Sequence, residues 1–352
     1  MKALILAGGS GTRLWPMSVE KTPKQLLSII GESSLMTQSV ARLASVVEKN
    51  DIWIVTNGAC AAQVNDHCPE VPEIQIIAEP FPLGTCLAVG LGLMHITRQD
   101  PDAIVVVGWA DSYIGNESRF QEALRIAEML VDNVDGVILS VPPTYPATGY
   151  GYVETGDPIP GSENCYEIRR FEEKPTTSRA DEFIASGHHY WNTGISVWKA
   201  SKLLNLMADH TPDHFRALER VAPHLGTPSE RTMIEECFAD LERVSIDHAI
   251  FEKADRMATI AIDLNWSDIG SWSAVHDILA GTEKNVTRGP VVTVDTDKCL
   301  IFSQKRLIAT LGVSNLVIVE TADAVLIANK DDTERMKELY DEVRKYGGDK
   351  YL

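Results

Sequence analysis

The sequence predicts an α/β protein with a mostly parallel mixed sheet, followed by a small β-rich domain. Up to about residue 141, short apolar runs alternate with segments of helical length and periodicity. Strands that alternate with helices indicate parallel pairing through right-handed crossovers. The first apolar run, Ala3–Ala7, ends in a glycine-rich turn, which is the usual position of a ligand loop in such sheets. Beyond about Glu283 the runs are short and strand-like, which predicts the β-rich domain.

Each element of the first part is expected from its own pattern. The expected strands are Ala3–Ala7, Asp51–Thr56, Ile74–Ala78, Ala103–Val107 and Gly136–Val141. The expected helices are Leu35–Val47, Ala59–Cys68, Thr85–Arg98 and Ser118–Val131. Prolines and glycines then punctuate short strands in Thr144–Trp198, and Ser201–Lys253 is expected to be helical with breaks at its prolines. The expected tail comprises Val291–Val294, Leu300–Phe302, Leu307–Thr310, Leu316–Val319, Ala324–Ile327 and a helix over Thr333–Tyr346.

Composition excludes several classes of protein. The chain has 352 residues, 44% of them hydrophobic and 23% charged, which are ordinary globular values. A formal net charge of −18 leaves no basic face for nucleic acid. No run approaches the roughly 20 apolar residues of a membrane span, and no signal peptide is expected. Six scattered cysteines without a Cys-x-x-Cys pair indicate reduced thiols and a cytoplasmic location.

The glycine-rich turn Gly8-Gly9-Ser10-Gly11-Thr12-Arg13, followed by Pro23-Lys24-Gln25, predicts a triphosphate site. Glycines let backbone N–H groups approach phosphate oxygens, while an arginine and a lysine supply full positive charge. A Walker A loop is excluded because no lysine follows Gly11 in register, and Leu14 replaces the last glycine of the dinucleotide pattern. The plain alternative is an exposed turn after a first strand.

The run Gly-Gly-x-Gly-Thr-Arg-Leu-Trp-Pro at 8–16, with Pro-Lys-Gln at 23–25, resembles the signature of sugar-phosphate nucleotidyltransferases, in the mannose-1-phosphate guanylyltransferase branch. The resemblance implies a Rossmann-like nucleotidyltransferase fold and a small C-terminal left-handed β-helix-like domain. It implies a catalytic domain over 1–282, with a GTP half to about 141 and a sugar-phosphate half over about 142–282. The β-helix-like domain with its terminal helix then covers 283–352.

Two aspartates are candidate ligands of a metal ion. Asp111 follows the expected strand Ala103–Val107, and Asp268 lies between Trp266 and Trp272. An exposed loop aspartate is the alternative for Asp111, and a helix N-cap is the alternative for Asp268. In the family, aspartates at these two positions hold Mg²⁺, whose preference for carboxylate oxygens fits. Ser112 departs from the histidine that family members often have there.

A second group of motifs is expected to bind the sugar phosphate. Phe171-Glu172-Glu173-Lys174-Pro175 resembles the family's Phe-x-Glu-Lys-Pro element, in which Glu173 would bind sugar hydroxyls and Lys174 the phosphate. Gly149 would let the backbone approach the hexose, and Asn192 would bind a hydroxyl. A solvated charge run and a turn before Trp198 are the plain alternatives. Ser245–Ala249 resembles a family segment that lines the sugar pocket, but an N-cap at Ser245 explains it equally well.

Base selection is assigned to Glu79-Pro80. A carboxylate matches guanine, which presents adjacent N1–H and N2–H₂ donors, whereas uracil also requires its acceptors to be matched. The segment 82–85 departs from the Arg-Asn-Thr that is common in this branch. The nucleotide-binding residues implied by the resemblance are Leu6, Ala7, Gly8, Gly9, Gly11, Thr12, Arg13, Glu79, Pro80, Gly84, Thr85 and Gly108.

The expected reaction transfers GMP from GTP to α-D-mannose 1-phosphate, giving GDP-mannose and pyrophosphate with the aid of Mg²⁺. Arg13 would hold the leaving pyrophosphate, Lys24 would neutralise the α-phosphate, and Asp111 and Asp268 would carry the metal. Two alternatives stay open: a guanylyltransferase for another hexose or heptose 1-phosphate, and a catalytically silent nucleotide-sugar sensor. The edge strands of the β-rich tail make a homo-oligomer possible.

Overall fold

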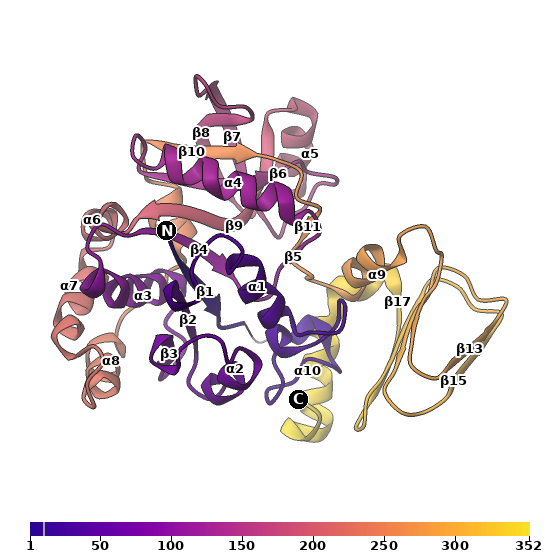
Figure 1. The fold of residues 1–352 in the computed structure, drawn as a ribbon. Helices are drawn as coiled ribbons and strands as arrows, with labels where there is room; N and C mark the ends of the chain where they lie inside the picture. The colour runs from indigo at the N-terminus through magenta and orange to yellow at the C-terminus, as the bar shows by residue number, and fades with distance from the viewer. Residues whose placement is uncertain (10) are drawn as a thin grey trace. The chain divides into compact units, whose positions relative to one another are not determined.

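The computed structural model describes residues 1–9 and 11–352, so Ser10 of the glycine loop lies outside the described residues (Figure 1). The chain forms two compact units. The first, the sheet unit, comprises Met1–Gly8, Ser39–Ala110 and Ile114–Trp266. The second, the loop unit, comprises Gly9–Gln38, Asp111–Tyr113 and Ser267–Leu352. The glycine loop therefore groups with the C-terminal region. The expected boundary between residues 282 and 283 stays a prediction.

The sheet unit is built on a nine-stranded mixed sheet in the order β3-β2-β1-β4-β9-β6-β10-β8-β7. The strands β3, β2, β1 and β4 are parallel neighbours, whereas β9 is antiparallel to both β4 and β6. The bounds are β1 Lys2–Ala7, β2 Ile52–Asn57, β3 Ile76–Glu79, β4 Ile104–Trp109, β6 Gly136–Val141, β7 Gly151–Pro158, β8 Cys165–Glu173, β9 His189–Lys199 and β10 Met257–Ala261.

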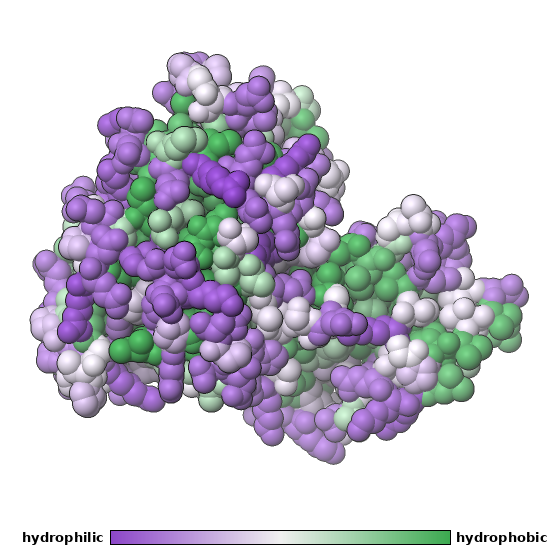
Figure 2. All heavy atoms as spheres, in the orientation of Figure 1, coloured by the Kyte–Doolittle hydropathy of each residue, from purple (hydrophilic) through white to green (hydrophobic). Residues whose placement is uncertain are grey.

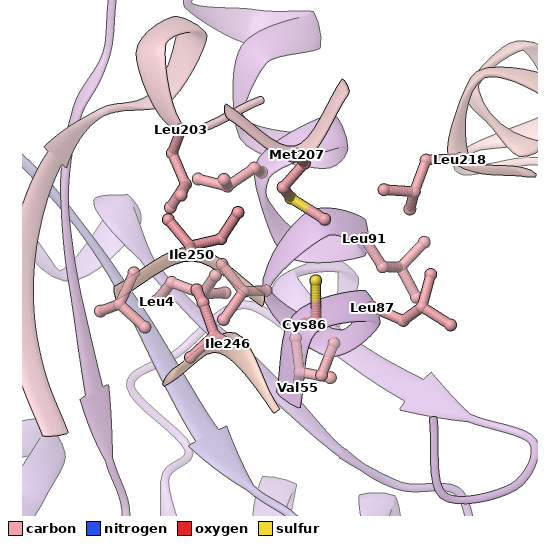
Figure 3. Close-up of a cluster of buried hydrophobic side chains, with 14 of the residues drawn as sticks. Leu4, Val55, Cys86, Leu87, Leu91, Leu203, Met207, Leu218, Ile246 and Ile250 are labelled. Atoms are coloured by element: carbon pink, nitrogen blue, oxygen red, sulfur yellow. The ribbon is translucent and has the colours of Figure 1, made fainter. Parts of the chain in front are cut away.

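Helices cover this sheet and close its core. Their bounds are α2 Ala61–His67, α3 Thr85–Gln99, α4 Glu117–Leu130, α5 Thr177–Ser186, α6 Ala200–His210, α7 Pro212–Val221 and α8 Glu230–Phe238. Helix α3 packs on β1 and β2, and α6 and α7 pack on α3. Figure 3 shows the apolar side chains between them, among which Leu4, Leu91 and Met207 are fully buried. This core fixes the carboxyl ends of β1 and β4, from which two predicted ligand loops start.

The loop unit joins the segment 9–38 to a β-helix-like array. Parallel strands β12, β14 and β16 form one sheet, with β17 antiparallel at its edge, and β13 pairs in parallel with β15. The bounds are β12 Val286–Arg288, β13 Val291–Val294, β14 Leu300–Ser303, β15 Ile308–Leu311, β16 Leu316–Glu320, β17 Val325–Asn329, α9 Trp272–Ala280 and α10 Met336–Gly347. Three elements, α1 Leu35–Leu43, β5 Tyr113–Ile114 and β11 Trp266–Ser267, lie where the chain passes between units.

The loop unit has its own core and an apolar outer surface. Leu14, Trp15, Trp272, Phe302 and Tyr340 are buried together in it. Figure 2 shows apolar side chains on the outside of the C-terminal strands. Those with more than half of their surface exposed are Val292, Val294, Leu307, Leu311, Val325 and Ile327. Within residues 1–9 and 11–352, no helix is both long and apolar enough to cross a bilayer.

The α/β class and the β-helix-like tail are confirmed. Most element bounds differ by one or two residues, and the expected helix Leu35–Val47 ends earlier, at Leu43. The expected strand start at Ile74 was wrong, because Glu73–Gln75 form a 3-10 turn in which Gln75 N donates to Pro72 O at 2.8 Å. The last helix starts at Met336, after a 3-10 turn capped by the Asn329 side chain. The segment around Asn192 is part of β9 and not a turn before it.

Candidate active site

Lys24 is the centre of the candidate site in the loop unit. Its Nζ donates to Asp111 Oδ2 at 2.9 Å and also to the carbonyl oxygen of Asp268. The Lys24 side chain is 9% exposed and that of Asp111 is 32% exposed, so the ammonium is withdrawn from water while the carboxylate remains accessible. Three residues that are far apart in sequence therefore meet at one nitrogen atom.

The glycine loop lies against the same group. Gly11 has a left-handed backbone with φ +62°, and a Cβ there would fall 2.4 Å from Lys24 Cβ. A Cβ on Gly9 would lie 3.8 Å from Asp111 Oδ2. Gly11 is therefore required both by its conformation and by the close approach of Lys24. The predicted association of the loop with Lys24 and Asp111 is present in the structure.

Arg13 makes a different contact. Its Nη1 lies 3.6 Å from Glu334 Oε2, and the two side chains are 49% and 67% exposed. An exposed ion pair of this kind contributes only about 0–1 kcal/mol, so it competes weakly with a phosphate for the guanidinium. Sequence reasoning did not find Glu334, because nothing in the motif signals a partner from the C-terminal region.

The alternative that Asp268 caps helix α9 is wrong. Ser271 is the cap, since its Oγ accepts from Ala274 N at 3.3 Å. Asp268 instead accepts from Gly270 N through Oδ1 at 2.9 Å, which fixes the turn that carries the carboxylate. Ile269, between them, is fully buried. The Asp268 loop is thus anchored by packing and by its own hydrogen bonds.

The carboxylates of Asp111 and Asp268 are the candidate ligands of a divalent metal ion. No group of three or more His, Cys, Asp or Glu side chains in 1–9 and 11–352 could hold a metal ion alone. The Asp111 carboxylate bonds Lys24, whereas Asp268 reaches Lys24 through its carbonyl oxygen, so a metal ion shared by the two carboxylates stays a prediction. Nucleotidyl transferases of this kind generally use a divalent metal ion. Two carboxylates with phosphate oxygens and water are a ligand set that such an ion accepts.

Glu79 carries an unusual carboxyl in the sheet unit. The residue is 6% exposed, its Oε1 is buried with no hydrogen-bond partner among the described residues, and a Cβ on Gly8 would lie 3.8 Å from its Oε2. Burial raises the pKa of Glu79 to about 7, partly offset by the Leu83 backbone N–H. A buried carboxylate oxygen that lacks a hydrogen-bond partner is typical of a residue that binds a ligand. The carboxylate of Glu79 lies beside the end of β1.

The structure explains why Gly84 and Thr85 stand at the start of helix α3. Gly84 has φ +83°, and a Cβ there would fall 3.1 Å from Val244 O. Thr85 Oγ1 accepts from Ile246 N at 2.9 Å. Both residues therefore join the start of α3 to the segment that precedes Asp247. Their predicted contact with the nucleotide stays a prediction.

The other predicted nucleotide-binding residues lie in or directly after parallel strands of the sheet, or in the loop that follows β1. Leu6 and Ala7 are buried in β1, and Leu6 O accepts from Ala110 N at 3.0 Å. Gly108 lies in β4, which is parallel to β1. Pro80 follows β3, and Thr12 belongs to the loop unit.

Three of the predicted sugar-phosphate residues, Glu173, Lys174 and Asn192, gather around Asp247 in the sheet unit. Asn192 Nδ2 donates to Asp247 Oδ1 at 3.2 Å, and Asn192 Oδ1 accepts from Gly194 N at 2.8 Å. Burial, followed by the charge of Glu173, raises the pKa of Asp247 to about 6. Lys174 Nζ lies 2.6 Å from Glu173 Oε1. Its positive charge acts in the opposite direction and lowers the pKa of Asp247. Two carboxyls, an amide and an ammonium thus share one polar cluster.

One residue of this cluster was not predicted, and one glycine beside it has a structural role. Asp247 was absent from the predicted site, although the run Ser245–Ala249 signalled it; Ser245 also caps that turn by accepting from His248 N at 3.2 Å. A Cβ on Gly149 would meet nothing within 4 Å, whereas one on Gly151 would lie 2.6 Å from Glu173 Oε2. A side chain at position 151 would therefore displace Glu173, and the approach of the hexose to Gly149 stays a prediction.

Comparison with known proteins agrees with this arrangement. A family model described as nucleotidyl transferase matches residues 2–285. A second, described as a MannoseP isomerase/GMP-like beta-helix domain, matches residues 289–343. The two models together account for nearly the whole chain.

Curated relatives match along almost the full length. A mannose-1-phosphate guanylyltransferase from Klebsiella pneumoniae is 34% identical over 339 residues, which is 95% of this chain and 72% of the relative. One from Escherichia coli has the same identity and the same coverage.

Among solved structures, one described as mannose-1-phosphate geranyltransferase from Thermus thermophilus has a TM-score of 0.87 and 30% identity. The match covers 97% of this chain and 99% of that chain. A Bacillus anthracis structure described as a putative glucose-1-phosphate thymidylyltransferase is 19% identical with a TM-score of 0.51, over 79% of this chain and 93% of that one. This second likeness concerns the fold alone.

Proposed function

The chain belongs to the nucleotidyl transferase family, and on that premise we propose that it transfers GMP from GTP to α-D-mannose 1-phosphate. The products are GDP-mannose and pyrophosphate. The observation that carries the proposal is the convergence of Asp111 Oδ2 and Asp268 O on Lys24 Nζ beside the glycine loop. Both the motif and this geometry are suited to a phosphate-rich substrate.

In the reaction, a phosphate oxygen of the sugar substrate attacks the α-phosphorus of GTP in line with the bond to the β-phosphate. The new P–O bond forms as the bond to the bridging oxygen breaks, and that oxygen leaves with pyrophosphate. Because both reactants are anions, positioning and charge neutralisation dominate catalysis. No nucleophile from the protein is needed.

The candidate catalytic residues of the loop unit each have one task in this scheme. Lys24 neutralises charge at the α-phosphate, and the backbone N–H groups of Gly9 and Gly11 bind the triphosphate. Arg13 exchanges its weak contact with Glu334 for the leaving pyrophosphate. Asp111 and Asp268 would hold a Mg²⁺ ion, which would supply further positive charge to the phosphate oxygens.

Specificity is assigned to the sheet unit. Glu79 as a carboxylate accepts from N1–H and N2–H₂ of guanine, a pattern that uracil lacks. Glu173 and Asn192 bind sugar hydroxyls, and Lys174 binds the sugar phosphate. The buried Oε1 of Glu79, which has no partner within the described residues, supports its assignment. Six free cysteines, all buried, support a cytoplasmic location, which stays a prediction.

The test is a pyrophosphate-release assay that crosses four nucleoside triphosphates with mannose, glucose and heptose 1-phosphates, with and without Mg²⁺. We expect rapid release only with GTP, mannose 1-phosphate and Mg²⁺ together, and GDP-mannose as the second product. Faster release with another sugar phosphate would replace the sugar assignment. No release with any pair would overturn the enzymatic function and favour a nucleotide-sugar sensor.

A further inference from the structure

Two buried tryptophans of the loop unit link three remote segments by hydrogen bonds. Trp15 Nε1 donates to Tyr351 O at 2.8 Å, across 336 residues. Trp272 Nε1 donates to Trp15 O at 3.0 Å, across 257 residues. The two residues are 5% and 0% exposed. The glycine loop, the start of α9 and the C-terminal segment are thereby tied together.

The tied segments are those that carry the candidate catalytic groups. Trp15 follows Arg13 by two residues, and Trp272 follows Asp268 by four. Gly11 packs against Lys24, and Lys24 donates to Asp268 O. A shift of either tryptophan would therefore be transmitted to the atoms around Lys24 Nζ.

The burial of these two indole rings does not by itself explain why their N–H groups are hydrogen-bonded. The ring of Trp272 meets Phe302 edge-on, with centroids 6.0 Å apart, and a phenyl ring could fill much of the same space. In the sheet unit, Trp53 is buried at 2% exposure, yet its Nε1 has no partner among the described residues. Burial of an indole in this protein does not by itself require its N–H to be bonded.

We propose that Trp15 and Trp272 are positioning residues, which hold the glycine loop and the Asp268 loop in the arrangement that guanylyl transfer needs. The C-terminal segment at Tyr351 anchors them. The inference rests on the proposed function, because that reaction sets the need for accurate placement. In-line phosphoryl chemistry is sensitive to displacements of about 1 Å, which can reduce the rate by roughly 100-fold.

The experiment compares Trp15→Phe and Trp272→Phe with Trp53→Phe as the matched control. We expect kcat to fall between about 10- and 100-fold in the first two and less than about twofold in the control. GTP binding measured by calorimetry in EDTA should weaken at least about threefold in the same two variants. Equal losses in all three variants would overturn the proposal, as would unchanged GTP binding.

A second substitution separates the hydrogen bond from packing and does not depend on the phenylalanine variants folding. Benzothienylalanine keeps the shape of the indole but replaces N–H by sulfur. At positions 15 and 272 it should reproduce the loss of kcat and of GTP affinity. Wild-type values with this analogue would contradict the inference. If wild-type protein makes no GDP-mannose, the proposed function fails, and the GTP titration still tests the role of the tryptophans.

Discussion

Lys24 donates a hydrogen bond to Asp111 at 2.9 Å although 87 residues separate them. Lys24 comes from the segment after β1 and Asp111 from the segment after β4, and these two strands are parallel neighbours. Ligands of such sheets bind at the carboxyl ends of the strands. The ion pair therefore follows from the topology and leaves Asp111 partly accessible beside a buried ammonium.

Asp268→Asn is expected to lower kcat by about 100-fold or more while the fold is kept. The amide oxygen can still accept from Gly270 N, which now bonds Asp268 Oδ1 at 2.9 Å, but the negative charge needed by a metal ion is lost. Steady-state kinetics and circular dichroism measure the two effects. The exposed Asp255→Asn is the control, and near-normal turnover of the Asp268 variant would exclude a metal role.

Glu79→Gln is expected to reduce the preference for GTP over UTP by about 10- to 100-fold in kcat/KM, because an amide NH₂ would face a guanine donor. With a Glu79 pKa of about 7, the preference of the wild type should also rise between pH 6 and 8 as the carboxylate forms. Competition between the two nucleotides measures both. Exposed Glu73→Gln is the control. An unchanged preference for GTP in the Glu79→Gln variant would mean that another residue recognises guanine.

Asp247→Asn is expected to raise the KM for mannose 1-phosphate several-fold and to leave the KM for GTP unchanged. The variant should also unfold at a higher temperature above pH 6. A carboxyl with a raised native pKa binds more protons when folded, so its cost to stability appears as pH rises from about 4 through about 6. Asp240→Asn, at an exposed position, is the control. A higher KM for GTP alone would place Asp247 outside the sugar-phosphate site.

Glu320→Gln tests the β-helix-like array. Backbone N–H groups of Gln304 and Lys305 donate to Glu320 Oε2 at 2.9 and 3.0 Å, and such bonds lower the pKa of Glu320 to about 2. A lowered native pKa stabilises the fold above about pH 4, and this stabilisation is lost as pH falls toward 2. Calorimetry should therefore show a lower Tm than wild type at pH 7 and a smaller difference at pH 3. A Tm difference that does not depend on pH, or an equal Tm difference for Glu283→Gln, would contradict this role.

The sequence was sufficient wherever one local pattern determined the structure. The buried strands around Leu4 and Val106 and the glycine loop were predicted from apolar runs and turn residues. Asp111 was placed correctly after β4 because its position depends only on where that strand ends.

Features that depend on long-range packing were not predicted. The contact of Arg13 with Glu334 and the hydrogen bond of Trp15 to Tyr351 join ends of the chain that no motif relates. Asp247 was not predicted as a site residue because an N-cap at Ser245 explained the same segment. The structure contains both the N-cap and the contact of Asp247 with Asn192. A turn before Trp198 was the alternative for the segment at Asn192, whereas strand β9 contains this segment and accommodates Gly194 with φ +75°.

The most direct measurement compares pyrophosphate release from GTP and mannose 1-phosphate by wild type and by Lys24→Met, with exposed Lys49→Met as the control. Wild type and control should release one pyrophosphate for each GDP-mannose formed, and the Lys24 variant should be slower by about 100-fold or more. Turnover of Lys24→Met within a factor of about two of wild type would contradict the assignment of catalysis to the group around Lys24 Nζ.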